Sequence, residues 1–206
     1  MTLFEWLRQH DVDPDGVLFV NLVTAGYRPC DKSRLLGVVV SGMEGEPVLV
    51  LESGATDEQI GGNTQYTGLN WTDYTEAAVP AARAQRLLLD VVQSRPRSMV
   101  VSYSVSNFLQ PWLLNTAWAQ YLLQYPMLDF VDFSKAMDQG VLPKYLAAAS
   151  LPEFSEWIHG GTTRGYKVES VLRRFGAVSR SGVKACLDRN FQLRDAFRTA
   201  AGAVLC

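Results

Sequence analysis

The stretch VLFVNLVTAG, residues 17–26, decides the fold that the sequence predicts. Its apolar, β-branched run ends at a glycine, which is typical of a buried strand that enters a turn. Asn21 is the only amide within it. A buried amide without partners costs about 1 to 3 kcal/mol, so Asn21 is expected to be hydrogen-bonded if it is buried. It is either a satisfied bystander that bonds a neighbouring turn or the mark of a site.

Two more strands are predicted directly after this one, SRLLGVVVSG (33–42) and PVLVLES (47–53). The glycines of GMEGE, between these two runs, indicate a tight hairpin. The chain is therefore expected to open with a three-stranded antiparallel meander.

Helices and strands are expected to alternate after the meander. The predictions are a helix over 76–93, a strand over 99–105 (MVVSYSV), a helix from Pro111 to about residue 125, a helix over 168–175 and a last helix from a Ser181 cap to about residue 200. LDFVDF (128–133) reads equally as a strand or a loop. This order predicts a mixed α/β sheet flanked by helices. We expect one domain over 1–206, with an irregular insertion at about 138–166.

Composition excludes several classes of protein. The chain of 206 residues is 48% hydrophobic and 19% charged, which is typical of a globular protein. It has no apolar run of the length that spans a membrane, and no signal-peptide pattern, so a cytoplasmic protein is expected. Its cysteines, Cys30, Cys186 and Cys206, are widely spaced and predict neither a disulfide framework nor a zinc site.

Positive charge gathers in the last part of the chain. Residues 164–206 hold 9 Lys and Arg against 3 Asp and Glu, although the whole chain has a formal net charge of -2. This pattern is either a solvated helix face or a surface for phosphates. The candidates for contact with nucleic acid are Lys167, Arg173, Arg174, Arg180, Lys184 and Arg189.

The order of motifs resembles the DEDD-type 3′-to-5′ exonucleases (DnaQ-like), which have the ribonuclease H-like fold. In that family the first strand carries Asp-x-Glu-Thr-x-Gly. FVNLVTAG keeps Thr24 and Gly26 but has Asn21 and Val23 at the positions of the two acids. The segment QYTGLNWTDY (65–74) is similar to the Thr-Gly turn before the family's first helix.

The later motifs are similar in order and spacing. VVSYSVSNFLQPWLL (100–114) follows the family's second motif and has Leu109 at the position of its Asp. LDFVDFSKAM resembles a further segment through Asp132. VKACLD resembles the last motif, in which Asp188 matches the acid and Val183 replaces the His. By helical geometry, Asp188 is either a solvated acid or a relic of the site.

The resemblance implies two-metal hydrolysis of a phosphodiester, and the missing acids argue against it. Mg²⁺ and Mn²⁺ require anionic oxygen ligands. Three of the four matched positions are not acidic, so only Asp188 remains as a metal-ligand candidate. We therefore expect a pseudoenzyme that binds single-stranded nucleic acid or serves as a scaffold. No cofactor is expected, and Mg²⁺ or Mn²⁺ would matter only if some nuclease activity persists.

Two alternatives remain open at this stage. One is an active nuclease with a rearranged or one-metal site built from Asp188 and Asp132, with Asp129 or Glu169 as further candidates. The other is a protein-interaction domain, in which the aromatic part of the insertion, LPEFSEWIHGG (151–161), docks a protein partner through Trp157.

Overall fold

The structure is a computed structural model, and it describes residues 7–8, 11–26, 29, 33–95, 98–140, 142 and 168–202. A five-stranded sheet has the order β3-β2-β1-β4-β5. Its strands are β1 (Val17–Ala25), β2 (Arg34–Ser41), β3 (Val48–Leu51), β4 (Met99–Ser102) and β5 (Met127–Asp129). β1, β2 and β3 pair antiparallel, whereas β4 runs parallel to β1 and β5 parallel to β4. The predicted meander and mixed sheet are confirmed.

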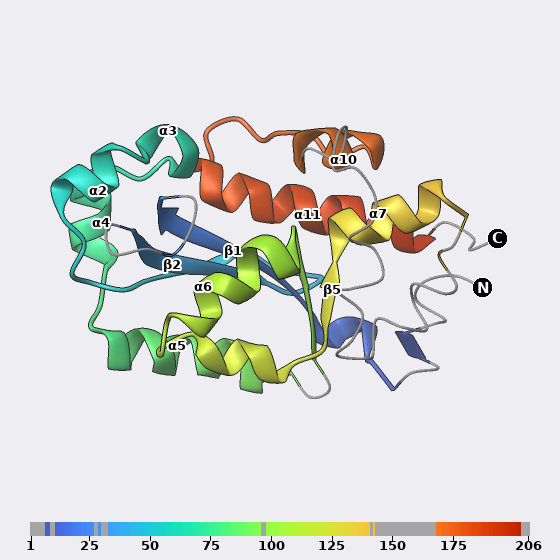
Figure 1. The fold of residues 1–206 in the computed structure, drawn as a ribbon, viewed down its shortest axis with the longest axis horizontal. Helices are drawn as coiled ribbons and strands as arrows, with labels where there is room; N and C mark the ends of the chain where they lie inside the picture. The colour runs from blue at the N-terminus through green and yellow to red at the C-terminus, as the bar shows by residue number, and fades with distance from the viewer. Residues whose placement is uncertain are drawn as a thin grey trace.

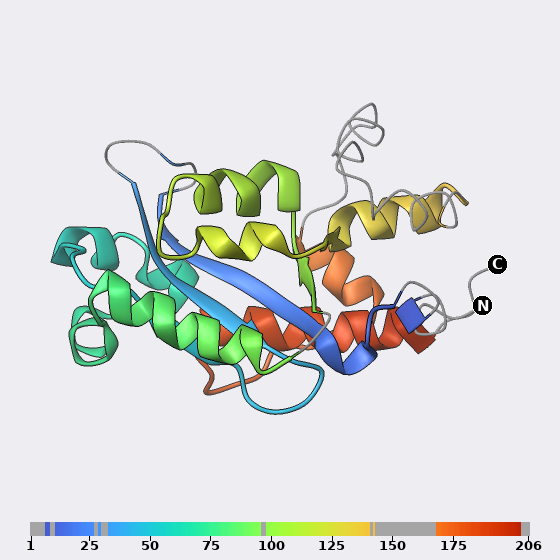
Figure 2. The ribbon, with the colours of Figure 1, turned by 90° about the horizontal axis from the view of Figure 1, so that it is seen from below.

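Helices cover both faces of this sheet (Figures 1 and 2). They are α2 (Asp57–Gly61), α3 (Thr64–Thr67), α4 (Trp71–Ala77), α5 (Ala81–Gln93), α6 (Gln110–Leu114), α7 (Phe130–Asp138), α10 (Val168–Arg174) and α11 (Ala185–Gly202). The shorter turns are η1 (Pro14–Gly16), η2 (Val105–Leu109) and η3 (Gln120–Gln124). No described helix is long and apolar enough to cross a membrane.

The alternating directions of the β1 side chains explain why helices cover both faces of the sheet. Successive side chains of a strand point to opposite faces, so an apolar strand can fill two cores. Val17 and Phe19 pack with α7, α10 and α11, and the Phe19 ring meets Phe197 of α11 edge-on at 5.3 Å. Leu18 and Val20 pack on the opposite face with α5 and α6. Nearly every residue of β1 is therefore apolar because both of its faces are covered.

Two predicted helices differ from the structure. The helix expected over 76–93 begins only at Ala81, because Pro80 stands at its N-cap and Val79 bridges to Glu52 beside β3. The helix expected from Pro111 to about residue 125 ends at Leu114, and a 3₁₀ turn over 120–124 follows separately. Asn115 ends α6 by donating its side-chain amide to the Pro111 carbonyl at 2.7 Å, a local bond that competes with helix continuation.

The ambiguous LDFVDF segment is divided between two elements. β5 ends at Asp129, and the Asp129 carboxylate then caps α7 by accepting from the backbone N–H groups of Val131 and Asp132.

The helix predicted over 168–175 is confirmed as α10, and Gly176 follows it with φ 73°. The last helix begins at Ala185, four residues after the predicted Ser181 cap. Most of the predicted insertion at 138–166, with Trp157, lies outside the described residues.

A close contact joins α3 to the start of α11. Gly68 ends α3 in the left-handed conformation, with φ 70°. A Cβ atom at this position would lie 2.7 Å from the Ala185 backbone nitrogen and 3.2 Å from the Lys184 Cα. Only glycine fits both this φ and this distance.

Candidate functional site

The candidate site lies where β1 and β4 separate. The two strands pair only from Val17 to Phe19 on β1, and β4 ends at Ser102, while β1 continues to Ala25. Ligands of α/β sheets bind at such carboxyl ends of parallel strands. A cavity of about 510 Å³ lies here, which we call the β1–β4 cavity. Its lining residues are Asn21, Leu22, Thr24, Gly26, Asn63, Tyr66, Thr67, Ser102, Tyr103, Ser104, Phe108, Val168, Cys186 and Arg189.

Asn21 is a hydrogen-bonded amide at the edge of this cavity. Its side chain is 8% exposed. In the amide orientation that the neighbouring groups require, Nδ2 donates to the Val20 carbonyl and Oδ1 accepts from the Asn190 backbone N–H, each at 3.0 Å. The amide thus joins β1 to α11, and no anionic ligand stands where the resemblance places the first acid.

The other two non-acidic positions are packed into apolar clusters. Val23 is 1% exposed and packs with Leu36 and Leu51 on the α11 face of the sheet. Leu109 is fully buried among the residues of the opposite face, with Leu88 and Trp112. Asn21 and Val23 share one face of β1, whereas Leu109 lies on the opposite face of the sheet. Neither Val23 nor Leu109 lines the β1–β4 cavity.

Asp188 holds a loop rather than facing the cavity. Its carboxylate accepts from the Ser179 hydroxyl at 2.7 Å, the Arg180 backbone N–H at 2.8 Å and the Gln192 amide at 2.6 Å. The residue is 6% exposed, so it is not a solvated acid. The α11 residues that do line the cavity are its neighbours Cys186 and Arg189.

The turn after β4 forms one wall of the cavity. Ser104 has φ 45° and ψ 59°, a conformation that is uncommon for a residue other than glycine and is often found at functional sites. The next N–H group, of Val105, donates to the Asp129 carboxylate at 2.5 Å. Burial, with a smaller contribution from the charge of Asp132, raises the pKa of Asp129 to about 7. The buried Asp129 carboxyl thus holds the turn after β4 in place through Val105.

Arg189 supplies the charge of the cavity. It is the single Lys, Arg, Asp or Glu among the lining residues that the structure describes. Burial raises the pKa of the Tyr103 hydroxyl and of the Cys186 thiol, so both groups are neutral at pH 7. The Tyr103 hydroxyl donates to the Arg189 backbone carbonyl at 2.8 Å and so fixes this turn of α11 against the end of β4. The described lining residues therefore carry one positive charge and no negative charge.

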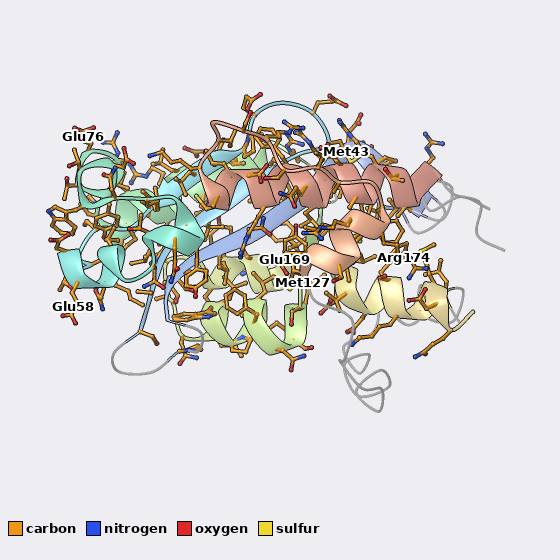
Figure 3. The ribbon with its side chains drawn as sticks, turned by 90° about the horizontal axis from the view of Figure 1, so that it is seen from above. Met43, Glu58, Glu76, Met127, Glu169 and Arg174 are labelled. Carbon is orange, nitrogen blue, oxygen red and sulfur yellow. The ribbon has the colours of Figure 1, made fainter. Side chains whose placement is uncertain are left out.

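An acid of α10 lies close to this guanidinium. The Glu169 carboxylate lies 3.9 Å from the Arg189 guanidinium, and the two side chains are 60% and 47% exposed. Figure 3 labels Glu169 near the start of α10 and Arg174 at its opposite end. Exposed pairs of this kind contribute about 0 to 1 kcal/mol, so the pair can open readily.

The other basic candidates are mostly engaged with acidic partners. Arg174 pairs with Asp138, Arg180 with Asp195 at 3.0 Å, and Lys184 with Asp73. The hydrogen bond from Lys184 is the main cause that lowers the pKa of Asp73. Arg173 is exposed and has no ion pair with any described residue, whereas Lys167 lies outside the described part of the chain. The structure thus brings only Arg189 to the cavity.

The acids considered for a rearranged nuclease site are occupied at separate places. Asp132 forms an ion pair with Lys135 at 3.0 Å within α7. Asp129 caps that helix, Asp188 holds the loop before α11, and Glu169 faces Arg189. No described group of three His, Cys, Asp or Glu residues could hold a metal ion. The two divalent metals that the resemblance implies do not fit a cavity lined by amide, hydroxyl, aromatic and guanidinium groups.

Several lining residues were not among the predicted site residues, namely Asn63, Tyr66, Ser104 and Phe108. Ser104 and Phe108 lie in the second motif, and Tyr66 lies in the Thr-Gly segment, so the motifs located them. The sequence pattern drew attention to the matched acid positions instead. Of these, Asn21 lines the cavity, Val23 and Leu109 are buried in apolar clusters, and Asp188 bonds the loop before α11.

The fold is shared with solved exonucleases. The chain resembles an Escherichia coli exonuclease I–single-stranded DNA complex in its zinc-bound form, with a TM-score of 0.55 and 13% identity over 89% of this chain and 39% of that chain. It also resembles a chain in the structure of the yeast NOT1 MIF4G domain co-crystallised with CAF1 (TM-score 0.51, 10% identity, 96% of this chain and 83% of that chain). A third likeness is to a 3′-exonuclease structure described as showing 3′-end-specific recognition of a histone mRNA stem-loop (TM-score 0.51, 10% identity, 95% and 69%).

These likenesses establish the fold of the chain. The ribonuclease H-like exonuclease fold that the sequence predicted is confirmed. The chain spans only 39% and 41% of the length of two exonuclease I chains that it matches. The sequence matches no protein-family model and no curated protein.

Proposed function

We propose that the chain is a non-catalytic member of the exonuclease fold that binds the end of single-stranded nucleic acid in the β1–β4 cavity. The observation that carries this proposal is the lining of the cavity. It holds one cation and three aromatic rings, and its described residues include no carboxylate.

A phosphate group would meet attraction rather than repulsion in such a cavity. Phosphate contacts supply most of the affinity of non-specific nucleic-acid binding, and they make that affinity dependent on salt. Arg189 offers the contact, and the rings of Tyr66, Tyr103 and Phe108 offer surfaces for bases. Stacking of a base on an aromatic side chain contributes about 1 to 3 kcal/mol and tolerates any base.

The structural neighbours support the same class of ligand. One is a complex with single-stranded DNA, and another is described as recognising the 3′ end of an RNA stem-loop. The lost acids distinguish this chain from a metal-dependent nuclease, because Asn21 and Val23 cannot supply anionic ligands. We therefore expect binding without hydrolysis, and we expect neither Mg²⁺ nor Mn²⁺ to be required.

Fluorescence anisotropy with a labelled single-stranded oligonucleotide tests the binding. Affinity should fall when salt rises from about 50 to 200 mM, and Arg189→Ala should weaken it. Arg86→Ala is the matched control, since Arg86 is an exposed arginine of α5 on the opposite face of the sheet. Affinity that does not change with salt, or no binding at all, would contradict the proposal.

A second assay tests the absence of hydrolysis. The protein is incubated at high concentration with an end-labelled oligonucleotide and Mn²⁺, and released nucleotides are resolved. We expect none. Release that Asp188→Ala abolishes would favour an active nuclease with a rearranged site instead.

A further inference from the structure

We infer that the β1–β4 cavity recognises one nucleoside monophosphate unit without a divalent metal, and that the Arg189 guanidinium binds its phosphate. This inference rests on the proposed function and deepens it. It names one nucleotide as the unit that the cavity holds, and Arg189 as the group that binds the phosphate in place of metal ions.

The size of the cavity suits one nucleotide. At about 510 Å³ it lies within the range of about 300 to 1,000 Å³ for pockets that enclose most of a drug-sized ligand. A nucleoside monophosphate belongs to that size class. A longer stretch of strand would have to extend past the rim, where Tyr66 is 57% exposed.

The charge of the cavity suits a single phosphate. Arg189 is its one charged group among the described lining residues, and the neutral Tyr103 and Cys186 add none. A guanidinium binds two phosphate oxygens through parallel N–H donors, which fixes orientation as well as charge. The bond from the Tyr103 hydroxyl to the Arg189 carbonyl, at 2.8 Å, positions the residue beside the cavity before the ligand arrives.

The uncharged groups suit the rest of the unit. The Ser104 carbonyl accepts from the backbone N–H groups of Phe108 and Leu109, at 2.9 and 3.2 Å, whereas its hydroxyl has no hydrogen bond to a described residue. Its strained backbone holds it in the cavity wall. Its hydroxyl can therefore bond a sugar or phosphate oxygen. Phe108 and Tyr66 line the same cavity and present rings to a base. Asn21 is a neutral amide, already bonded to Val20 and Asn190, so it offers no negative charge that would hold a cation beside the phosphate.

Isothermal titration with a nucleoside 5′-monophosphate, and with the matching nucleoside, tests this inference. The monophosphate should bind at least about tenfold more tightly, which corresponds to about 1.4 kcal/mol. The difference should be the same in Mg²⁺ and in EDTA. Arg189→Ala should remove it, Arg189→Lys should keep part of it, and Arg86→Ala should leave it intact. Arg189→Gln serves as a second variant, with thermal unfolding as the control for folding.

The outcomes separate the inference from the proposed function. If the oligonucleotide binds but the monophosphate does not, the proposed function holds and the inference is overturned. Loss of monophosphate binding in EDTA, or its persistence at full strength in Arg189→Ala, also overturns it. Competition between the monophosphate and a linear oligonucleotide identifies the unit as a strand end, whereas binding without competition identifies a free nucleotide. A circular single strand that competes as well as a linear one would contradict recognition of an end.

Discussion

Glu169 and Arg189 face each other across 3.9 Å, at the place where α10 approaches α11. The acid is positioned to compete with a phosphate for the one guanidinium of the β1–β4 cavity.

The first prediction concerns this competition. Glu169→Gln should raise the affinity for a single-stranded oligonucleotide about two- to fivefold, because an exposed pair contributes no more than about 1 kcal/mol. Anisotropy titration measures the change. Glu76→Gln removes the same charge from α4, away from Glu169 (Figure 3), and should change the affinity less. Equal gains in both variants would indicate a general effect of net charge.

A second prediction concerns the amide of β1. Asn21→Asp restores an acid but should lower the free energy of unfolding by about 1 to 3 kcal/mol, because a buried carboxylate cannot donate to the Val20 carbonyl. It should not restore hydrolysis, since Val23 remains apolar. Urea unfolding measures the stability, and Asn107→Asp is the control, because Asn107 is exposed. A stable variant that releases nucleotides with Mn²⁺ would show that the site needs only one acid.

A third prediction separates a structural role of Asp188 from a metal-binding one. Asp188→Ala removes three hydrogen bonds to a buried carboxylate and should lower the free energy of unfolding by about 2 to 3 kcal/mol. Asp90→Ala, at an exposed position of α5, should change it by less than about 0.5 kcal/mol. A metal ligand would behave differently, because its removal would relieve repulsion in the metal-free protein and would abolish any stabilisation by Mn²⁺.

A fourth prediction follows from the raised pKa of Asp129. The folded state holds this proton up to about pH 7, whereas the unfolded chain releases it near the ordinary value of 3.8. The stability that this group contributes is therefore complete below about pH 4 and falls as the pH rises to about 7, by up to about 1 kcal/mol per unit. Asp129→Asn should flatten this part of the profile, as measured by urea unfolding between pH 4 and 8. Parallel profiles for the two proteins would assign the pH dependence to other groups.

The strands were predictable from sequence because their signal is local. The run 17–25 is apolar at nearly every position, and glycines mark both ends of the following hairpin turn. The hydrophobic pattern and the turn residues therefore both predict the same strands. The helix errors have local causes too. Pro80 and Asn115 each set a helix boundary inside a pattern that apolar spacing alone would extend. Pro80 stands at the start of α5 and lacks a backbone N–H donor. Asn115 follows the end of α6, where its side chain bonds a backbone carbonyl.

The candidate site was predictable in place but not in composition. Motif order located the end of β1 and the turn after β4, which do meet at the cavity. The side chains that enter it depend on helix rotation and on the π-helical turn η2, which directs Leu109 to the opposite face of the sheet. On α11, two consecutive residues point to different places. The Asp188 carboxylate bonds the loop before the helix, whereas Arg189 lines the cavity. Matching residues along a sequence carries no information on such rotations.

Gly68 gives a physical reason for the Thr-Gly pair in the segment QYTGLNWTDY. A methyl group there would press on the backbone at the start of α11 and move α3, with Tyr66 and Thr67, away from the cavity. Thr67 and Thr24 likewise bond backbone groups, those of Asn63, Leu69 and Gly26. The Thr and Gly residues on which the resemblance rests thus hold segments of the scaffold together beside the cavity. A Thr-Gly pattern of this kind can therefore be required by the fold alone, whatever chemistry the neighbouring cavity performs.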